Sequence, residues 1–298
     1  MVPGWLQVSL RSLADTAQTG PPAGEFRTRA SLLEARRGWH DREDHRNAGG
    51  PPAAVLVHGA WHGAWCWEPA VAALAADGIS AVAIDLPGHG NDPGPMGDLH
   101  GDAARVAAVL DALSGPVVLV GHAYGGAVIT EAGSHRAVSH LVYLAAFALD
   151  DGESCGDVAI HEAASAGISH QGRPDLAAGY VPGSNGTVTL DRDVARSCFY
   201  QDCDPGTAGW AVARLGPQPL ISLQQQPYAV AWRTKPSTYV VCADDQAIHP
   251  GLQRILARRC ITAVEWPTGH APFLARPDLV AGLLAGLAAR ADGAACAR

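Results

Sequence analysis

The chain has 298 residues, 48% of them hydrophobic and 17% charged, a composition that excludes a disordered or collagen-like protein. Its 29 acidic and 21 basic residues give a formal net charge of -8, which argues against a nucleic-acid partner. Seven cysteines without a C-x-x-C pair indicate reduced thiols rather than a disulfide framework or a zinc site. The longest apolar stretch near a terminus, 279–289, is shorter than the roughly 20 residues of a membrane helix. We therefore expect a soluble cytoplasmic protein that acts on a small molecule and contacts no membrane.

The first 52 residues differ from the rest, because they carry a small net positive charge while the remainder is acidic. They end in Gly-Gly-Pro-Pro at 49–52, a combination that stops helices and is typical of a linker. We predict that residues 1–52 form an N-terminal arm, either a partly ordered appendage or a segment that docks on the body or on a second subunit. A homodimer formed through this arm or through the cap described below is compatible with the sequence.

From residue 53 onward, apolar runs alternate with amphipathic stretches. Short apolar runs typical of strands buried on both faces occur at 53–57, 79–84, 116–120 and 141–144. Helical periodicity occurs between them, at 67–76 and 99–113. This order predicts an α/β protein with a mostly parallel sheet and crossover helices.

The regular alternation stops at residue 147 and returns near residue 236. Residues 147–235 are rich in Gly and Pro and leave room only for short helices, so we predict a mainly helical cap inserted into the domain. Apolar runs at 237–242 and 261–266, followed by an amphipathic last helix, continue the sheet pattern. The predicted core therefore comprises residues 53–146 and 236–298.

A strand-turn-helix motif carries the chemistry. Residues 121–126 read G-H-A-Y-G-G, which is the setting of the nucleophile elbow G-x-S-x-G, where glycines permit a sharp turn that lifts the central side chain above the sheet. The central residue here is Ala123, whose side chain has no oxygen with which to attack a carbonyl. His-Gly-Ala-Trp at 58–61 follows the first strand, where enzymes with a nucleophile elbow place the second oxyanion donor.

Candidate acid and base residues follow the last two predicted strands. Asp244 and Asp245 come after the strand at 237–242, and His270 comes after the strand that ends near residue 266. Because the carboxyl ends of parallel strands meet at one edge, His270 is expected near position 123 with a carboxylate fixing its tautomer.

The chain resembles the α/β-hydrolase branch that holds plant methyl-ester esterases, hydroxynitrile lyases and many bacterial esterases. The motifs that carry the resemblance are H-G-A-W-H-G-A-W-C-W at 58–67, D-L-P-G-H-G at 85–90, G-H-A-Y-G-G at 121–126, Y-V-V-C-A-D-D-Q-A-I at 239–248 and G-H at 269–270. The resemblance implies an α/β-hydrolase fold and a serine hydrolase that needs no metal or cofactor. It assigns the acid to Asp245, the base to His270 and the oxyanion hole to the backbone N–H groups of Ala60 and Tyr124. Ala123 stands where the family has serine.

These residues predict a hydrolase of carboxylic esters or lactones that acts on a bulky apolar or aromatic substrate. The aromatic residues expected to line its pocket are Trp61, Tyr124, Phe147 and Trp210. Since removal of the nucleophile abolishes turnover but leaves the pocket, this chain is expected to be a substrate-binding, inactive form.

Two explanations of Ala123 stay open. We favour an engineered serine-to-alanine change that traps intact substrate. The alternative is a natural non-hydrolytic protein, a lyase, epimerase or ligand-binding protein, that uses His270 and Asp245 without a covalent intermediate. A hydroxynitrile lyase is disfavoured, because the only lysine of the chain, Lys235, lies at the end of the cap.

Overall fold

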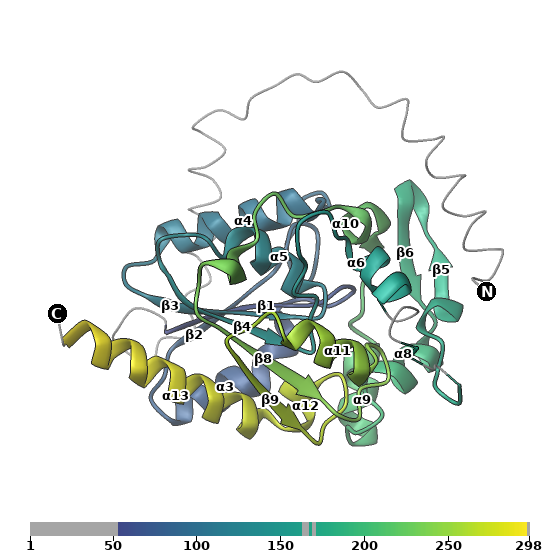
Figure 1. Ribbon diagram of the computed structural model, residues 1–298. Coiled ribbons are helices and arrows are strands. Elements are labelled where there is room, and N and C mark those ends of the chain that lie inside the picture. Colours follow the sequence, from purple (N-terminus) through teal and green to yellow (C-terminus); the bar gives the residue numbers. More distant parts are fainter. Residues whose placement is uncertain (1–52, 163–166, 169–170, 297–298) are drawn as a thin grey trace. The chain divides into compact units, whose positions relative to one another are not determined.

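In the computed structural model, a six-stranded parallel sheet forms the centre of the structure (Figure 1). Its strands, in spatial order, are β2 (Ala81–Ile84), β1 (Ala54–Val57), β3 (Val117–His122), β4 (Val138–Leu144), β8 (Ser237–Cys242) and β9 (Thr262–Trp266). Every neighbouring pair is parallel. Every residue of β1, β3 and β8 is buried, which explains why the sequence shows continuous apolar runs there instead of alternation. The predicted mostly parallel sheet is confirmed.

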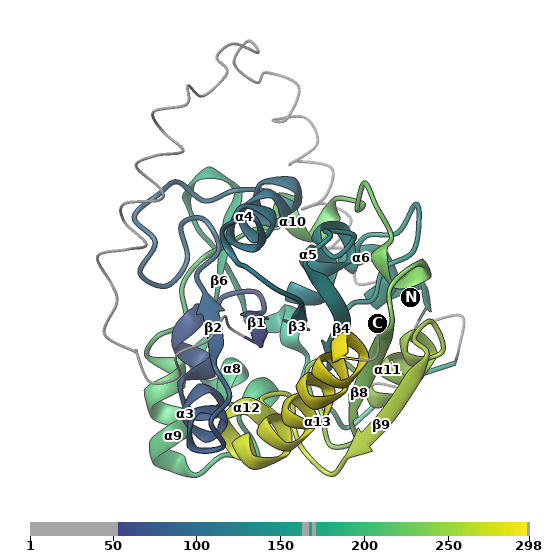
Figure 2. The ribbon, with the colours of Figure 1, turned by 90° about the vertical axis from the view of Figure 1, so that its left-hand side faces the viewer.

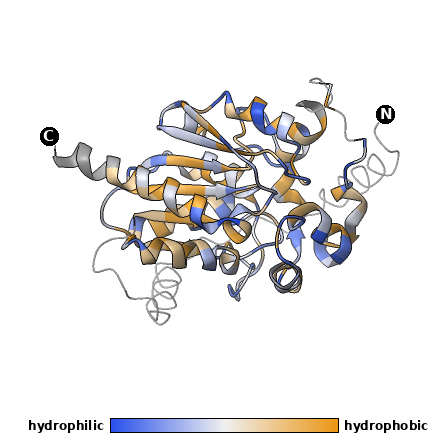
Figure 3. Cartoon of the chain, turned by 90° about the horizontal axis from the view of Figure 1, so that it is seen from below, coloured by the Kyte–Doolittle hydropathy of each residue, from blue (hydrophilic) through white to orange (hydrophobic). Residues whose placement is uncertain are grey.

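Helices cover both faces of this sheet. Figure 2 shows α3 (Glu68–Ala76) and α13 (Pro277–Cys296) on one face and α4 (Leu99–Ala112) and α5 (Gly125–Ala132) on the other. Shorter helices of the core are η2 (Ala64–Trp67), α11 (Pro250–Ala257) and α12 (Pro272–Ala275). Asp98 caps α4 by accepting a hydrogen bond from the N–H of Gly101 at 2.8 Å. Figure 3 shows apolar residues concentrated along the central strands, as expected for a sheet covered on both sides.

The segment between β4 and β8 lies at the carboxyl ends of the strands (Figure 1). Its helices are α6 (Cys155–Asp157), η3 (Val158–Glu162), η4 (Leu176–Gly179), η5 (Ser184–Gly186), α8 (Arg192–Phe199), α9 (Pro205–Val212), α10 (Leu220–Gln224) and η6 (Ala231–Arg233). It also contains an antiparallel three-stranded sheet of β5 (Tyr180–Pro182), β6 (Thr187–Leu190) and β7 (Gln218–Pro219). The sequence analysis predicted a mainly helical cap and did not identify these strands, because strands of two to four residues are too short to show a period.

The structure describes residues 53–162, 167–168 and 171–296. The arm expected at 1–52 lies outside these residues. Within them, no helix combines the length and the hydropathy that a bilayer crossing requires. The cytoplasmic location, the homodimer and the division into core and cap stay predictions.

Two glycines, one in the elbow and one on α13, allow a stability test with a control substitution. A Cβ on Gly121 would lie 2.4 Å from the backbone oxygen of Gly125, so we expect Gly121→Ala to lower the free energy of unfolding by about 3 kcal/mol or to prevent folding. Gly282 is exposed on α13, and apart from the adjacent residues and the backbone of its own helix no atom lies within 4 Å of an added Cβ. Gly282→Ala should raise the free energy of unfolding by about 0.5–1 kcal/mol. Urea titration followed by circular dichroism measures both, and equal stability of Gly121→Ala and the parent would contradict the close contact.

Candidate active site

The turn between β3 and α5 holds Ala123 in an unusual conformation. Its φ is +48°, in the left-handed region that residues with a side chain seldom adopt. The backbone oxygen of Ala123 accepts hydrogen bonds from the N–H groups of Gly126 at 3.0 Å and Phe147 at 3.1 Å, and these bonds hold the turn. A Cβ on Gly125 would lie 2.6 Å from the backbone oxygen of His58, so this glycine allows the elbow to approach the loop after β1. The elbow and that loop therefore share one site.

His270 and Asp245 form a buried pair beside the elbow. The Nδ1–H of His270 donates a hydrogen bond of 2.8 Å to Oδ2 of Asp245. Both side chains are almost fully buried, whereas Asp244 is exposed. The structure thus brings together the two residues that the family resemblance selected.

Four donors surround the carboxylate of Asp245. The N–H groups of Ala247 and Ile248 donate to Oδ1 at 2.7 and 3.0 Å, and Nε2 of Gln253 donates to Oδ2 at 2.7 Å beside His270. Gln253 is itself fixed, since its Oε1 accepts from the backbone N–H of Cys242 at 2.9 Å. These bonds fix the carboxylate and, through it, the ring of His270. The sequence analysis missed Gln253, because a glutamine on a helix gives no signal of this role.

Two further histidines hold the backbone of the site. Nε2–H of His122 donates to the backbone oxygen of His270 at 2.9 Å, and Nδ1–H of His62 donates to the backbone oxygen of Ala60 at 2.7 Å. Nε2 of His62 accepts from the hydroxyl of Tyr200 at 2.8 Å. Burial lowers the pKa of His62 to about 4, and burial together with the neighbouring His270 lowers the pKa of His122 well below its usual value. Both rings are therefore neutral at pH 7 and act as positioning groups.

The expected oxyanion donors are available for a ligand. Among the described residues, neither the N–H of Ala60 nor that of Tyr124 has a hydrogen-bond partner, and both residues line the same cavity as Ala123 and His270. Buried N–H groups rarely lack a partner, so two of them at one cavity point to an oxygen atom of a bound molecule.

Trp61 ties the loop after β1 to the cap. Its φ is +64°, and its N–H donates to Oε1 of Gln218 at 3.1 Å while its backbone oxygen accepts from the N–H of Gly216 at 2.8 Å. Its indole N–H donates to the backbone oxygen of Val188 at 3.0 Å. On the other side, Nε2 of His58 accepts from the N–H of Leu86 at 3.1 Å. The loop that carries Ala60 is therefore held from both the core and the cap.

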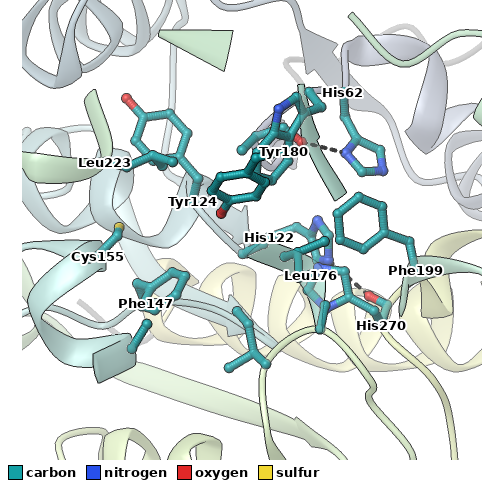
Figure 4. A pocket seen from close by; sticks show the side chains of 17 residues that line it. His62, His122, Tyr124, Phe147, Cys155, Leu176, Tyr180, Phe199, Leu223 and His270 are labelled. Atoms are coloured by element: carbon teal, nitrogen blue, oxygen red, sulfur yellow. Dashed lines mark hydrogen bonds between the residues drawn. The ribbon is translucent and has the colours of Figure 1, made fainter. Parts of the chain in front are cut away.

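A largely apolar cavity of about 150 Å³ lies over the elbow (Figure 4). The predicted site residues that line it are Ala60, Trp61, Ala123, Tyr124, Phe147 and His270. Trp210 is not among its lining residues, contrary to the sequence prediction. The centroid of its ring instead lies 5.3 Å from that of Trp65, and the guanidinium of Arg214 lies over the Trp210 ring at 4.3 Å. The sequence could not reveal which side of the short helix α9 faces the cavity. Phe199 also lines the cavity from the cap, and so does Tyr180, which was not among the predicted pocket residues.

The side chain of Tyr124 is bound to a buried acid. Its hydroxyl donates to Oδ2 of Asp102 at 2.6 Å, and Oδ1 of Asp102 has no partner among the described residues. Burial raises the pKa of Asp102 to about 7, against the lowering effect of the tyrosine hydrogen bond. The carboxyl group is therefore half protonated near neutral pH.

This raised pKa predicts a pH-dependent stability. Unfolded Asp has a pKa of about 3.9, so between about pH 4 and pH 7 the folded state binds more protons, and the free energy of unfolding falls as pH rises through this range. Asp102→Asn removes the ionisation and keeps the shape. We expect the stability of this variant, relative to the parent, to rise by about 4 kcal/mol from pH 4 to pH 8. Urea titrations at both pH values measure it, and a constant difference would mean that Asp102 titrates normally.

The sequence of residues 54–283 matches the alpha/beta hydrolase family, and the chain belongs to this family. The Alpha/beta hydrolase nvfD of Aspergillus novofumigatus is 31% identical to it, over 80% of this chain and 98% of that protein. Putative methylesterase 12 of Arabidopsis thaliana is 26% identical, over 75% of this chain and 68% of that protein. The fold of this chain is similar to that in the crystal structure of a pyrethroid hydrolase from Sphingobium faniae JZ-2. The TM-score is 0.69, and the identity is 24% over 80% of this chain and 97% of that one. The chain is therefore an alpha/beta hydrolase with esterase-type relatives.

Proposed function

We propose that the cavity is the site of a carboxylic ester or lactone hydrolase and that alanine replaces its nucleophilic serine, so that this chain binds the ester without cleaving it. One observation carries the proposal: a buried histidine–carboxylate pair and two unpartnered N–H groups meet at one apolar cavity with Ala123. The relatives support the ester class, since their names denote methylesterases and a pyrethroid hydrolase.

The arrangement accounts for ester hydrolysis once an oxygen stands at position 123. A serine hydroxyl there attacks the acyl carbon and gives its proton to Nε2 of His270, whose imidazolium is stabilised by Asp245. The oxyanion forms next to the N–H groups of Ala60 and Tyr124, each worth about 3 kcal/mol in the transition state. The leaving alcohol then takes the proton from His270. In the second step, water gives a proton to the same ring and attacks the acyl carbon, and the ring returns this proton to the serine oxygen as the acid leaves. With alanine, the first bond cannot form.

The cavity volume limits the substrate. A cavity of about 150 Å³ with apolar walls encloses roughly one benzene ring. The expectation of a bulky substrate is therefore restricted to esters that place one ring-sized apolar group inside the cavity. Phenyl acetate is a suitable probe.

Restoring the serine tests the proposal. We expect Ala123→Ser to raise the rate of phenyl acetate hydrolysis by about 10³-fold or more over the parent chain, because it completes the triad. Ala123→Gly, which also suits a positive φ but adds no oxygen, should leave the rate at the parent level. Spectrophotometric release of phenol measures both rates. A folded Ala123→Ser variant that stays at the parent rate would contradict the proposal.

A second candidate rests on the state of His270. Its Nε2 has no hydrogen-bond partner among the described residues, so it is free to remove a proton from carbon next to a ligand carbonyl, while the N–H groups of Ala60 and Tyr124 bind the enolate oxygen. This chemistry needs no serine and corresponds to a natural alanine at position 123. An alanine codon in the source gene agrees with it, whereas a serine codon agrees with an engineered change.

Proton exchange distinguishes this second candidate. Phenylacetone has one ring and an acidic methylene next to a carbonyl. If His270 acts as a carbon base, the parent chain should exchange the methylene protons in D₂O at least tenfold faster than buffer, and His270→Gln should abolish the increase. Proton NMR measures the loss of signal. Exchange at the buffer rate would rule this chemistry out for the probe's class of ketones.

A further inference from the structure

Most polar side chains around the cavity are already engaged. Both ring nitrogens of His62 make hydrogen bonds, to the backbone oxygen of Ala60 and to the hydroxyl of Tyr200. The hydroxyl of Tyr124 donates to Asp102. Nδ1 of His122 has no partner, but it lies against Gly59, where an added Cβ would be 2.9 Å away. Away from the elbow, these groups therefore offer a ligand few free hydrogen-bonding atoms.

Tyr180 is the exception. Its hydroxyl has no hydrogen-bond partner among the described residues, and Figure 4 shows its ring reaching over the cavity with the hydroxyl oxygen toward the interior, while the Tyr124 hydroxyl points away. Burial raises the pKa of Tyr180 to about 12, so the group stays a neutral hydroxyl that both donates and accepts. A hydroxyl that faces a largely apolar cavity and has no protein partner is suited to a polar group of a ligand.

Strand pairing holds the backbone at Tyr180. Tyr180 begins β5 and pairs with Leu190 of β6, and the N–H of Asp191 donates to the backbone oxygen of Gly179 at 2.7 Å. The ring of Tyr180 lies 5.6 Å from that of Trp61, which adjoins Ala60. The position of the hydroxyl is therefore coupled to the loop that would bind the ester carbonyl, and a ligand meets both groups in a fixed geometry.

The walls of the cavity carry no compensating charge. None of the described residues that line it is Lys, Arg, Asp or Glu. The nearby carboxylate of Asp175 acts on Tyr180 in the direction that disfavours negative charge. A carboxylate or phosphate on the ligand would lose its hydration there without an ion pair, which is costly.

We propose that Tyr180 is a specificity-determining residue that hydrogen-bonds a hydroxyl, or another neutral oxygen, on the ring-sized group of the ester. This inference rests on the proposed function, because it takes the ester carbonyl to lie at the N–H groups of Ala60 and Tyr124. It assigns the ligand class as uncharged aryl esters with one neutral hydrogen-bonding substituent.

The Ala123 chain itself allows the test, since it binds without turnover. Isothermal titration calorimetry compares 3- and 4-hydroxyphenyl acetate with 3- and 4-methylphenyl acetate, in which a methyl group replaces the hydroxyl. We expect Tyr180→Phe to weaken the binding of at least one hydroxy ester about tenfold and to change the methyl esters less than twofold. Tyr228→Phe is the matched control, because Tyr228 is 80% exposed and stacks on His100 outside the cavity. It should change none of the affinities.

The outcomes separate the two proposals. If the methyl esters bind the parent chain but Tyr180→Phe affects hydroxy and methyl esters alike, the role of Tyr180 is overturned while the ester site stands. If neither ester type binds and Ala123→Ser shows no hydrolysis, both proposals fail. 4-Carboxyphenyl acetate should bind more than tenfold weaker than the methyl ester, and equal binding would overturn the assignment to uncharged esters.

Discussion

The close approach of the elbow to the loop after β1 is the contact on which the site depends. β1 and β3 are hydrogen-bonded neighbours, and the backbone at Gly125 comes so near to His58 that no side chain fits between them. This contact places the N–H of Tyr124, at the start of α5, and that of Ala60 at one cavity. Glycine is required there because only its missing Cβ lets two backbones meet.

The elbow holds Ala123 in a strained backbone conformation. Ala123 occupies a positive φ that serves to present a side chain above the sheet, and the bonds from Gly126 and Phe147 hold it there. The carboxylate of Asp245 keeps all four of its donors. Under the proposed function, these bonds keep the geometry of an acyl-transfer site in place without the atom that would react.

The cap contributes residues and contacts to the candidate site. Through Trp61 it fixes the loop that carries Ala60, and through Tyr180 and Phe199 it supplies walls of the cavity. The ring of Phe199 stacks on that of His270 with centroids 5.2 Å apart. The segment between β4 and β8 thus contacts both the loop that carries Ala60 and the proposed base His270.

The sequence by itself determined the parallel sheet and the order of the site motifs, because buried strands and glycine turns follow from local composition. It also placed Asp245 and His270 at one edge, since parallel strands end together. Only the tertiary structure decided which cap residues face the cavity: Trp210 contacts Trp65, whereas Tyr180 lines the cavity. It also decided that Gln253, on the core helix α11, reaches the carboxylate of Asp245. The reason is physical, because short cap elements have no periodicity of their own and take their orientation from long-range packing against the core.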